Sequence, residues 1–253
     1  MAEKTRHLVV VTGFALAFVV VAFGSLSVAS VPWRASYPVH RTETMRGNSL
    51  RIFVDSGDLG LVPSQDKALH LRGTVHYSLH RPRLSWASSS TGTVFRSTCP
   101  ASAPYCSVDL TLAIPGSVRI NATVESGNLY ATNLAGDAVL RVDSGNVVAT
   151  SLSGKLRMSA SSGNVTGTVL TGRSASASVG SGDVTLSFLA PPGSVHASVN
   201  SGNITLALPA QIPYRVDASS NMGSTAVAVP TDPSSAHVVQ ASVDIGNVVV
   251  LAG

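Results

Sequence analysis

Two acidic residues hold equivalent places in a repeated motif of this 253-residue chain. Glu125 precedes one Ser-Gly-Asn tripeptide, and Asp143 precedes the next, 18 residues later. If the repeats stack as strands, the two carboxylates lie about 5 Å apart, a distance that suits a calcium site or a catalytic carboxyl pair. The following repeats carry Ser161, Gly180 and Asn200 at this place, so the acidic column ends after two members. We therefore expect two solvated turn residues.

A second group of titratable side chains follows one predicted strand, where basic residues alternate with apolar ones. His76 and His80 are separated by about 13 Å along such a strand, whereas zinc needs nitrogen ligands at about 2.1 Å. A zinc site on this strand is therefore not expected. The alternatives are a solvated strand face or a strip for an anionic partner. That strip comprises His70, Arg72, His76, His80, Arg81 and Arg83.

The two cysteines of the chain, Cys99 and Cys106, bracket a short loop that has a proline near each end, Pro100 and Pro104. A loop of this length closes a disulfide without strain if the two Cα atoms come within about 7 Å. Disulfides persist outside the cytosol, so a bridge here also predicts an exported domain. The alternative is a pair of buried free thiols. Two cysteines exclude a four-thiolate zinc site.

No motif for covalent, metal or phosphate chemistry is found in the sequence. GxSxG, HExxH, CxxC and GxxxxGK patterns are all absent. The basic residues are scattered, and no aromatic residues alternate with them as stacking platforms, so nucleic-acid binding is disfavoured. We therefore expect a non-enzymatic protein without catalytic residues, metal or cofactor.

The elements that must position these residues are set by a repeated tripeptide, Ser-Gly-Asn or Ser-Gly-Asp. From the second copy onward its glycines recur at intervals of 18, 18, 19 and 20 residues, which indicates a solenoid. Glycine allows positive φ at a turn, and the Asn or Asp beside it can accept local hydrogen bonds or stack in an amide ladder. The predicted turn residues are Gly57, Gly127, Gly145, Gly163, Gly182, Gly202 and Gly246, with Asn128, Asn146, Asn164, Asp183, Asn203 and Asn247.

Apolar residues at every second position flank each turn and predict strands with one buried face. Leu50, Ile52 and Val54 stand before the first turn, and equivalent columns precede the others. Each repeat is thus two short strands and two turns. Because like residues recur in register, we predict a parallel β-solenoid over residues 48–253 rather than a meander of antiparallel hairpins. Residues 63–117 are expected to be irregular or to bear insertions.

One repeat departs from the tripeptide. Aligning Tyr214, Val216 and Ala218 with the three apolar columns places Asn221 where the turn glycine should stand. Asparagine is the non-glycine residue that best tolerates the left-handed region. We therefore expect Asn221 to form this turn.

A column of hydroxyl side chains is predicted on the outward face of the second strand of the repeats. Such flat arrays can bind repetitive surfaces such as polysaccharide or ice, but threonine also favours exposed strands for its β propensity alone. We expect the structural explanation to hold. The column consists of Thr132, Thr150, Thr168 and Ser187.

The N-terminal region predicts a membrane segment. Residues 8–24 carry no charge, and extending this apolar run to residue 31 gives enough length to cross a bilayer. We expect residues 1–7 to be cytoplasmic, 8–31 to be a transmembrane signal-anchor and 32–47 to be a linker to an extracytoplasmic domain. The alternative is secretion after cleavage near Ala29, where small residues follow the run.

Composition is consistent with one folded, weakly charged domain. Hydrophobic residues make up 44% of the chain and charged residues 12%, which excludes disorder caused by low hydrophobicity and high charge. Aromatic residues are only 5%, so small and aliphatic side chains must build the core. The net charge is +4, a mild basic bias.

The series of Ser-Gly-Asn and Ser-Gly-Asp turns resembles the bacterial putative-adhesin family of unknown function. The resemblance covers about residues 48–252 and includes a strand that ends in proline, residues 108–115. It implies a parallel β-solenoid at a bacterial envelope and supplies no catalytic residues. We expect a membrane-anchored protein whose solenoid presents a surface for adhesion, or for binding or sensing an envelope polymer, an anionic lipid or a protein. The alternatives are a structural spacer and a carbohydrate-active enzyme on a solenoid scaffold.

Overall fold

The computed structural model describes residues 34–253, and all of their regular elements are β-strands, β1 to β20. The predicted cytoplasmic residues 1–7 and the predicted membrane segment 8–31 lie outside the described residues. Within the described part, no helix has the length and apolar character needed to cross a membrane.

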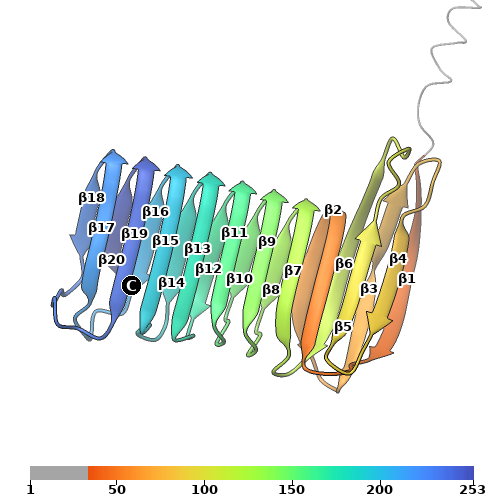
Figure 1. Cartoon of the computed structure of the whole chain (residues 1–253), viewed down its shortest axis with the longest axis horizontal. Helices are drawn as coiled ribbons and strands as arrows, with labels where there is room; N and C mark the ends of the chain where they lie inside the picture. The colour runs from red at the N-terminus through yellow and green to blue at the C-terminus, as the bar shows by residue number, and fades with distance from the viewer. Residues whose placement is uncertain (1–33) are drawn as a thin grey trace, which may run out of the picture. The chain divides into compact units, whose positions relative to one another are not determined.

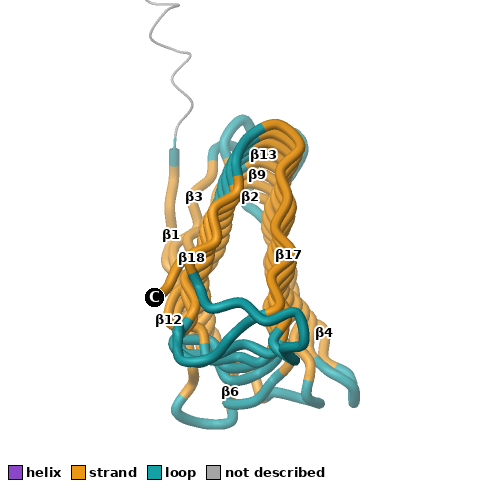
Figure 2. The backbone as a smooth tube through the Cα atoms, turned by 90° about the vertical axis from the view of Figure 1, so that its left-hand side faces the viewer, coloured by secondary structure: helices purple, strands orange, loops and turns teal. Residues whose placement is uncertain are grey.

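The strands form two sheets that face each other, and most turns of the chain add one strand to each (Figures 1 and 2). In spatial order, sheet 1 contains β4 (Arg83–Ser88), β5 (Thr93–Thr98), residues 49–56 of β2 (Ser49–Ser64), β7 (Arg119–Ser126), β9 (Ala138–Ser144), β11 (Leu156–Ser162), β13 (Ser174–Ser181), β15 (Ser194–Ser201), β19 (Val238–Ile245) and β17 (Arg215–Met222). Sheet 2 contains β1 (Ala35–Thr44), β3 (Ala68–Tyr77), β6 (Cys106–Pro115), the rest of β2, β8 (Leu129–Thr132), β10 (Val147–Thr150), β12 (Val165–Leu170), β14 (Val184–Phe188), β16 (Ile204–Leu208), β20 (Val248–Ala252) and β18 (Thr225–Ala228).

Parallel pairing in register confirms the predicted solenoid. In sheet 1, Leu156 of β11 pairs with Ala138 of β9 on one side and with Ala175 of β13 on the other. Each rung therefore repeats the position of the rung before it, with neighbouring strands about 4.8 Å apart. A hairpin meander is excluded for these rungs because their strands run in the same direction.

The core lies between the two sheets and is built from the inward columns. In the middle column of sheet 1, every side chain from β2 to β19 is at most 2% exposed. Small and aliphatic side chains fill the space between the two sheets. The core therefore needs few aromatic residues. This column contains Ile52, Ala122, Leu140, Met158, Ala177, Ala197 and Ala241.

The turn glycines stack directly on one another. From Gly57 to Gly202, and again at Gly246, their φ values lie between 119° and 139°, a region that side chains disfavour. A Cβ atom added to Gly145 would lie 1.9 Å from the carbonyl oxygen of Gly127 in the neighbouring rung. Next to them, the Asn146 backbone N–H and its Nδ2 donate to Asn128 Oδ1, at 3.2 and 2.9 Å. The amide ladder therefore runs beside the glycine column.

The last two rungs in space are exchanged relative to their order in the chain. β19 and β20, which come last in the sequence, lie between β15–β16 and β17–β18. The β17–β18 rung thus ends the stack (Figure 1). At the other end, β2 lies between β5–β6 and β7–β8, so the first rung of the chain is also an internal one.

The expected turn at Asn221 is wrong by two residues. Ser220 pairs with Val243 in the third inward column, and Gly223 forms the turn with φ of 155°. Because β17–β18 is the terminal rung, this column position is partly open to solvent and does not require an apolar residue. The Asn221 side chain instead donates a hydrogen bond to Asp244 Oδ1 at 3.0 Å. 

An antiparallel cap covers the other end of the stack, largely within the region that the sequence predicted to be irregular, as an atypical terminal unit would. Residues 35–44, expected as part of a linker, form β1, which pairs antiparallel with β3. β3 in turn pairs antiparallel with β6, and β4 with β5. Trp86 of β4 packs on Phe95 of β5 with ring centroids 4.6 Å apart, which helps to cover the core.

The predicted disulfide is confirmed, because Cys99 and Cys106 are bridged with their Cα atoms 5.9 Å apart. The bridge closes an enlarged turn. Ser97 of β5 pairs with Val54, and Val108 of β6 pairs with Gly57, so the loop stands where other rungs have the tripeptide turn. The insertion is therefore accommodated at the turn edge without breaking the ladder.

Gly145→Ala is expected to lower the free energy of unfolding by more than about 1 kcal/mol, since it combines an unfavourable φ with a backbone overlap. The measurement is a urea unfolding midpoint followed by circular dichroism. Gly116→Ala is the matched control, because a Cβ atom there meets nothing within 4 Å. Equal midpoints for the two variants would contradict the stacked turn.

Thiol labelling of the denatured, unreduced protein is expected to modify neither cysteine, and labelling after reduction should modify both, as judged by intact mass. The Cys99→Ser/Cys106→Ser variant should lose about 2–3 kcal/mol of stability, because the bridge closes a short loop in the unfolded chain. A labelled thiol before reduction would contradict the bridge.

Candidate functional site

The predicted basic strip begins on the outer face of sheet 2, where nearby acids partly neutralise it. His70 Nε2 lies 2.9 Å from Asp66 Oδ1, and His76 Nε2 lies 3.3 Å from Asp109 Oδ2. Arg72 is exposed between the two histidines on β3. These pairs lower the strip's attraction for an anionic ligand.

The rest of the predicted strip lies elsewhere. His80 and Arg81 belong to the connection after β3, and Arg83 begins β4 in sheet 1. The Arg81 guanidinium lies 5.6 Å from the centre of the Tyr77 ring, and its Nε donates to the Tyr77 hydroxyl at 3.1 Å. The structure therefore divides the six residues between two sheets and a corner instead of placing them on one face.

The acidic pair and the hydroxyl column are also located. Glu125 and Asp143 are exposed on adjacent rungs beside the turns. Among residues 34–253 no group of three or more His, Cys, Asp or Glu side chains is arranged to hold a metal ion. Thr168 Oγ1 donates to Thr150 Oγ1 at 3.2 Å, but the register between β12 and β14 then shifts near Val169. This irregularity interrupts the hydroxyl column before it reaches β14.

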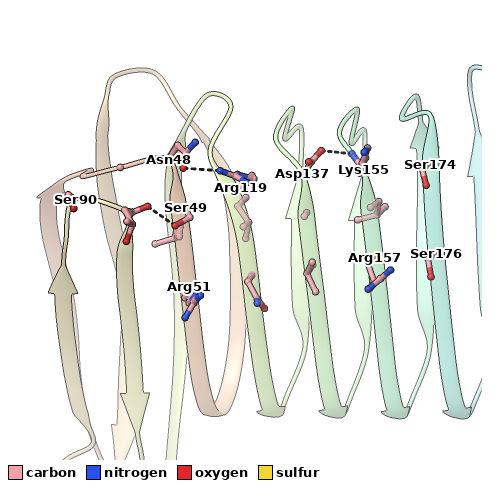
Figure 3. Close-up of a pocket in the computed structure, with 18 residues that line it drawn as sticks. Asn48, Ser49, Arg51, Ser90, Arg119, Asp137, Lys155, Arg157, Ser174 and Ser176 are labelled. Atoms are coloured by element: carbon pink, nitrogen blue, oxygen red, sulfur yellow. Dashed lines mark hydrogen bonds between the residues drawn. The ribbon is translucent and has the colours of Figure 1, made fainter.

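A groove of about 940 Å³ lies on the outer face of sheet 1, across the beginnings of β7, β9 and β11 (Figure 3). Its walls come from residues 47–51 at the start of β2 and from the loop that contains Ser90 and Thr91. Register places its side chains in two columns that cross the strands. One column is Ser49, Arg119, Asp137, Lys155 and Ser174, and the other is Arg51, Asn121, Val139, Arg157 and Ser176.

Four cationic side chains line this groove and none has an acidic partner. Arg51, Arg119, Lys155 and Arg157 are exposed, and no ion pair of the described residues includes them. The groove's single acid, Asp137, accepts the Lys155 backbone N–H at 2.9 Å through Oδ1. Four cations against one carboxylate leave an excess of three positive charges, so the groove favours anions.

Sequence reasoning missed the groove because its cations are far apart in the chain. The signal was nevertheless present in the repeat. Arg51 and Arg157 each stand six positions before a turn glycine, and Arg119 and Lys155 each stand eight positions before one. Comparing outward positions between repeats, instead of searching for contiguous basic residues, would have found both columns.

The sequence profile of the family described as Toastrack DUF4097 matches residues 108–249, which is more than half of the chain. No curated protein matches the chain.

Several solved structures are similar. A putative adhesin from Bacteroides fragilis NCTC 9343 is 13% identical, with 85% of this chain and 97% of that chain covered and a TM-score of 0.49. A putative cell adhesion protein from Clostridium sporogenes ATCC 15579 is 10% identical, with 86% and 100% covered and a TM-score of 0.36. A putative adhesin from Parabacteroides distasonis ATCC 8503 is 15% identical, with 87% and 98% covered and a TM-score of 0.36.

Asp66 is expected to titrate with a pKa of about 2, below its ordinary 3.8, because the Ala68 N–H, the His70 ring and the Ser64 hydroxyl donate hydrogen bonds to it. A folded-state pKa that is lowered contributes stability above pH 4, and this contribution is lost as the pH falls towards 2. The carboxyl carbon shift in an NMR titration measures the pKa. His70→Ala should raise it, whereas the control His76→Ala should not. An ordinary pKa in the unaltered protein would contradict the contacts.

Proposed function

The chain belongs to the Toastrack DUF4097 family, and we propose that it is a non-enzymatic, membrane-anchored envelope protein whose solenoid binds envelope components. The observation that carries the proposal is the groove on sheet 1, with four exposed cations and a single acid. A solenoid offers a rigid surface on which such a column is repeated, which suits adhesion to an extended partner.

The place where the chain enters the solenoid supports anchoring at a membrane. β1 starts at Ala35, which pairs with Tyr77, so the entry point lies beside the loop that follows β3. Leu79 in this loop is 75% exposed, and His80 and Arg81 are exposed next to it. An exposed apolar side chain among cations and tyrosines is the composition found at lipid headgroups.

The enzymatic alternative has little support in the described residues. Glu125 and Asp143 are solvent-exposed, neither lines the groove, and no other group converges on them. General acid–base chemistry needs such convergence within hydrogen-bond reach of a substrate. A structural spacer needs no ligand. A binding measurement therefore distinguishes the proposed function from a spacer.

The full-length protein in mild detergent is expected to be retained on purified cell-wall material at about 0.1 M salt and to be released towards 1 M. The screening length falls from about 10 Å to about 3 Å over this range, which weakens contacts between exposed charges. The measurement is the bound fraction in a sedimentation assay, with vesicles of anionic lipid in a parallel series. Retention on neither material would contradict the proposal and favour a spacer.

A further inference from the structure

The geometry points to a more specific ligand, and we propose that the groove on sheet 1 binds a linear anionic polymer that lies across the strands, along the stacking direction. This inference rests on the proposed binding function and names the class of its ligand. It concerns Arg51, Arg119, Lys155 and Arg157, of which none belongs to the basic strip predicted from the sequence.

The four cations are laid out over several rungs. Arg119 on β7 and Lys155, which immediately precedes β11, share one column and are two rungs apart, about 10 Å at 4.8 Å per rung. Arg51 on β2 and Arg157 on β11 share the other column and are three rungs apart, about 14 Å. The columns themselves are two residues apart along the strands, or about 7 Å. The charged area is therefore longer across the strands than along them (Figure 3).

An elongated, open site suits a polymer better than a small anion. A single phosphate or carboxylate can be contacted by neighbouring cations, but it cannot span positions about 14 Å apart. Small ligands are also usually held in pockets that bury most of their surface, whereas all four cationic side chains are exposed to solvent. A chain with an anionic group in each repeating unit can meet successive cations and gain affinity from several weak contacts.

The donors of the groove are free to take up such groups. A guanidinium carries five N–H donors and pairs in two-pronged fashion with phosphate or carboxylate. Arg119 uses one nitrogen for Asn48 Oδ1 at 3.2 Å, which leaves its other nitrogen donors for a ligand. Asp137 accepts the Lys155 backbone N–H, and it is the only negatively charged residue among those that line the groove.

The other acids of these rungs lie further along the strands, and the nearest, Asp55, is four residues after Arg51, about 13 Å away, where it accepts the Cys99 backbone N–H. Asp143 lies six residues after Asp137, and Glu125 lies six residues after Arg119. Six residues of extended chain span about 20 Å, twice the screening length at moderate ionic strength. Asn121 between Arg51 and Arg157, and Ser174 and Ser176 one rung beyond Lys155 and Arg157, offer uncharged hydrogen-bonding groups to the hydroxyls of a sugar or polyol backbone.

The test measures binding of the full-length protein in detergent to three polymers: poly(glycerol phosphate), polygalacturonate and dextran. We expect one or both charged polymers to bind and the neutral dextran not to bind. The first two arms distinguish phosphate from carboxylate as the source of negative charge. The inference of an extended anionic ligand would be overturned if dextran bound as tightly as the charged polymers, or if equimolar inorganic phosphate displaced a bound polymer.

Duplex DNA is a further control. If it bound as tightly as either charged polymer, the inference that the ligand is an envelope polymer would be overturned.

The variant Arg51→Gln/Arg157→Gln is expected to weaken polymer binding at least tenfold, equivalent to about 1.4 kcal/mol. The matched control is Arg72→Gln/Arg83→Gln, which removes two exposed arginines outside the groove and should change the dissociation constant less than twofold. Unfolding midpoints of both variants verify that they fold. Equal losses in the two variants, or none in the first, would overturn the inference. If wild-type protein is retained on cell wall but binds neither charged polymer, the inference fails and the proposed function stands.

Discussion

The architecture of this molecule depends on the close stacking of the turn glycines. From Gly127 to Gly246, a side chain at each of these turns would lie only 1.8–2.2 Å from the carbonyl oxygen of the glycine in the neighbouring rung. Such an approach is available only to glycine, and its φ is also one that only glycine adopts readily. Because the rungs from β2 to the terminal rung are each held to the next at this point, their register is fixed in both sheets. Outward side chains therefore form straight columns, and the basic groove exists only because Arg51 and Arg157 share one.

Hydrophobic burial explains the exchanged order of the last two rungs. β19 and β20 carry the more apolar sequences, and Val239 and Val248 of this rung are fully buried between two neighbours. The β17–β18 rung has fewer apolar residues and leaves Val227 42% exposed at the end of the stack. Placing the more polar rung outside buries more apolar surface than the sequential order would. It also gives the open edge polar and charged residues, which disfavour aggregation through that edge.

The predictable part of this fold is the part encoded locally. Alternation and the turn tripeptide repeat within about 20 residues, so they predicted the strands, the parallel stacking and the glycine turns. The rung exchange and β1 depend on pairings between distant segments, such as Ala35 with Tyr77, and no local pattern encodes these. The groove was missed for the same reason. The sequence drew attention to a contiguous stretch from His70 to Arg83, in which the chain bends after Tyr77, whereas the groove collects its cations from separate rungs.

The two outer faces of the solenoid differ in chemistry although the same repeat builds both. The strands of sheet 2 from β8 to β20 contain no charged residue. The matching strands of sheet 1, from β7 to β17, carry charges of both signs: Arg119, Arg141, Arg157 and Arg215, and the acids Glu125, Asp143, Asp217 and Asp244. Inward positions must stay small and apolar and turn positions must stay glycine, so only outward positions can vary without loss of the fold. In a chain with just 12% charged residues, four unpaired cations in one groove cannot be attributed to packing, because none of them contributes to the core. The anionic ligand proposed above would account for their presence.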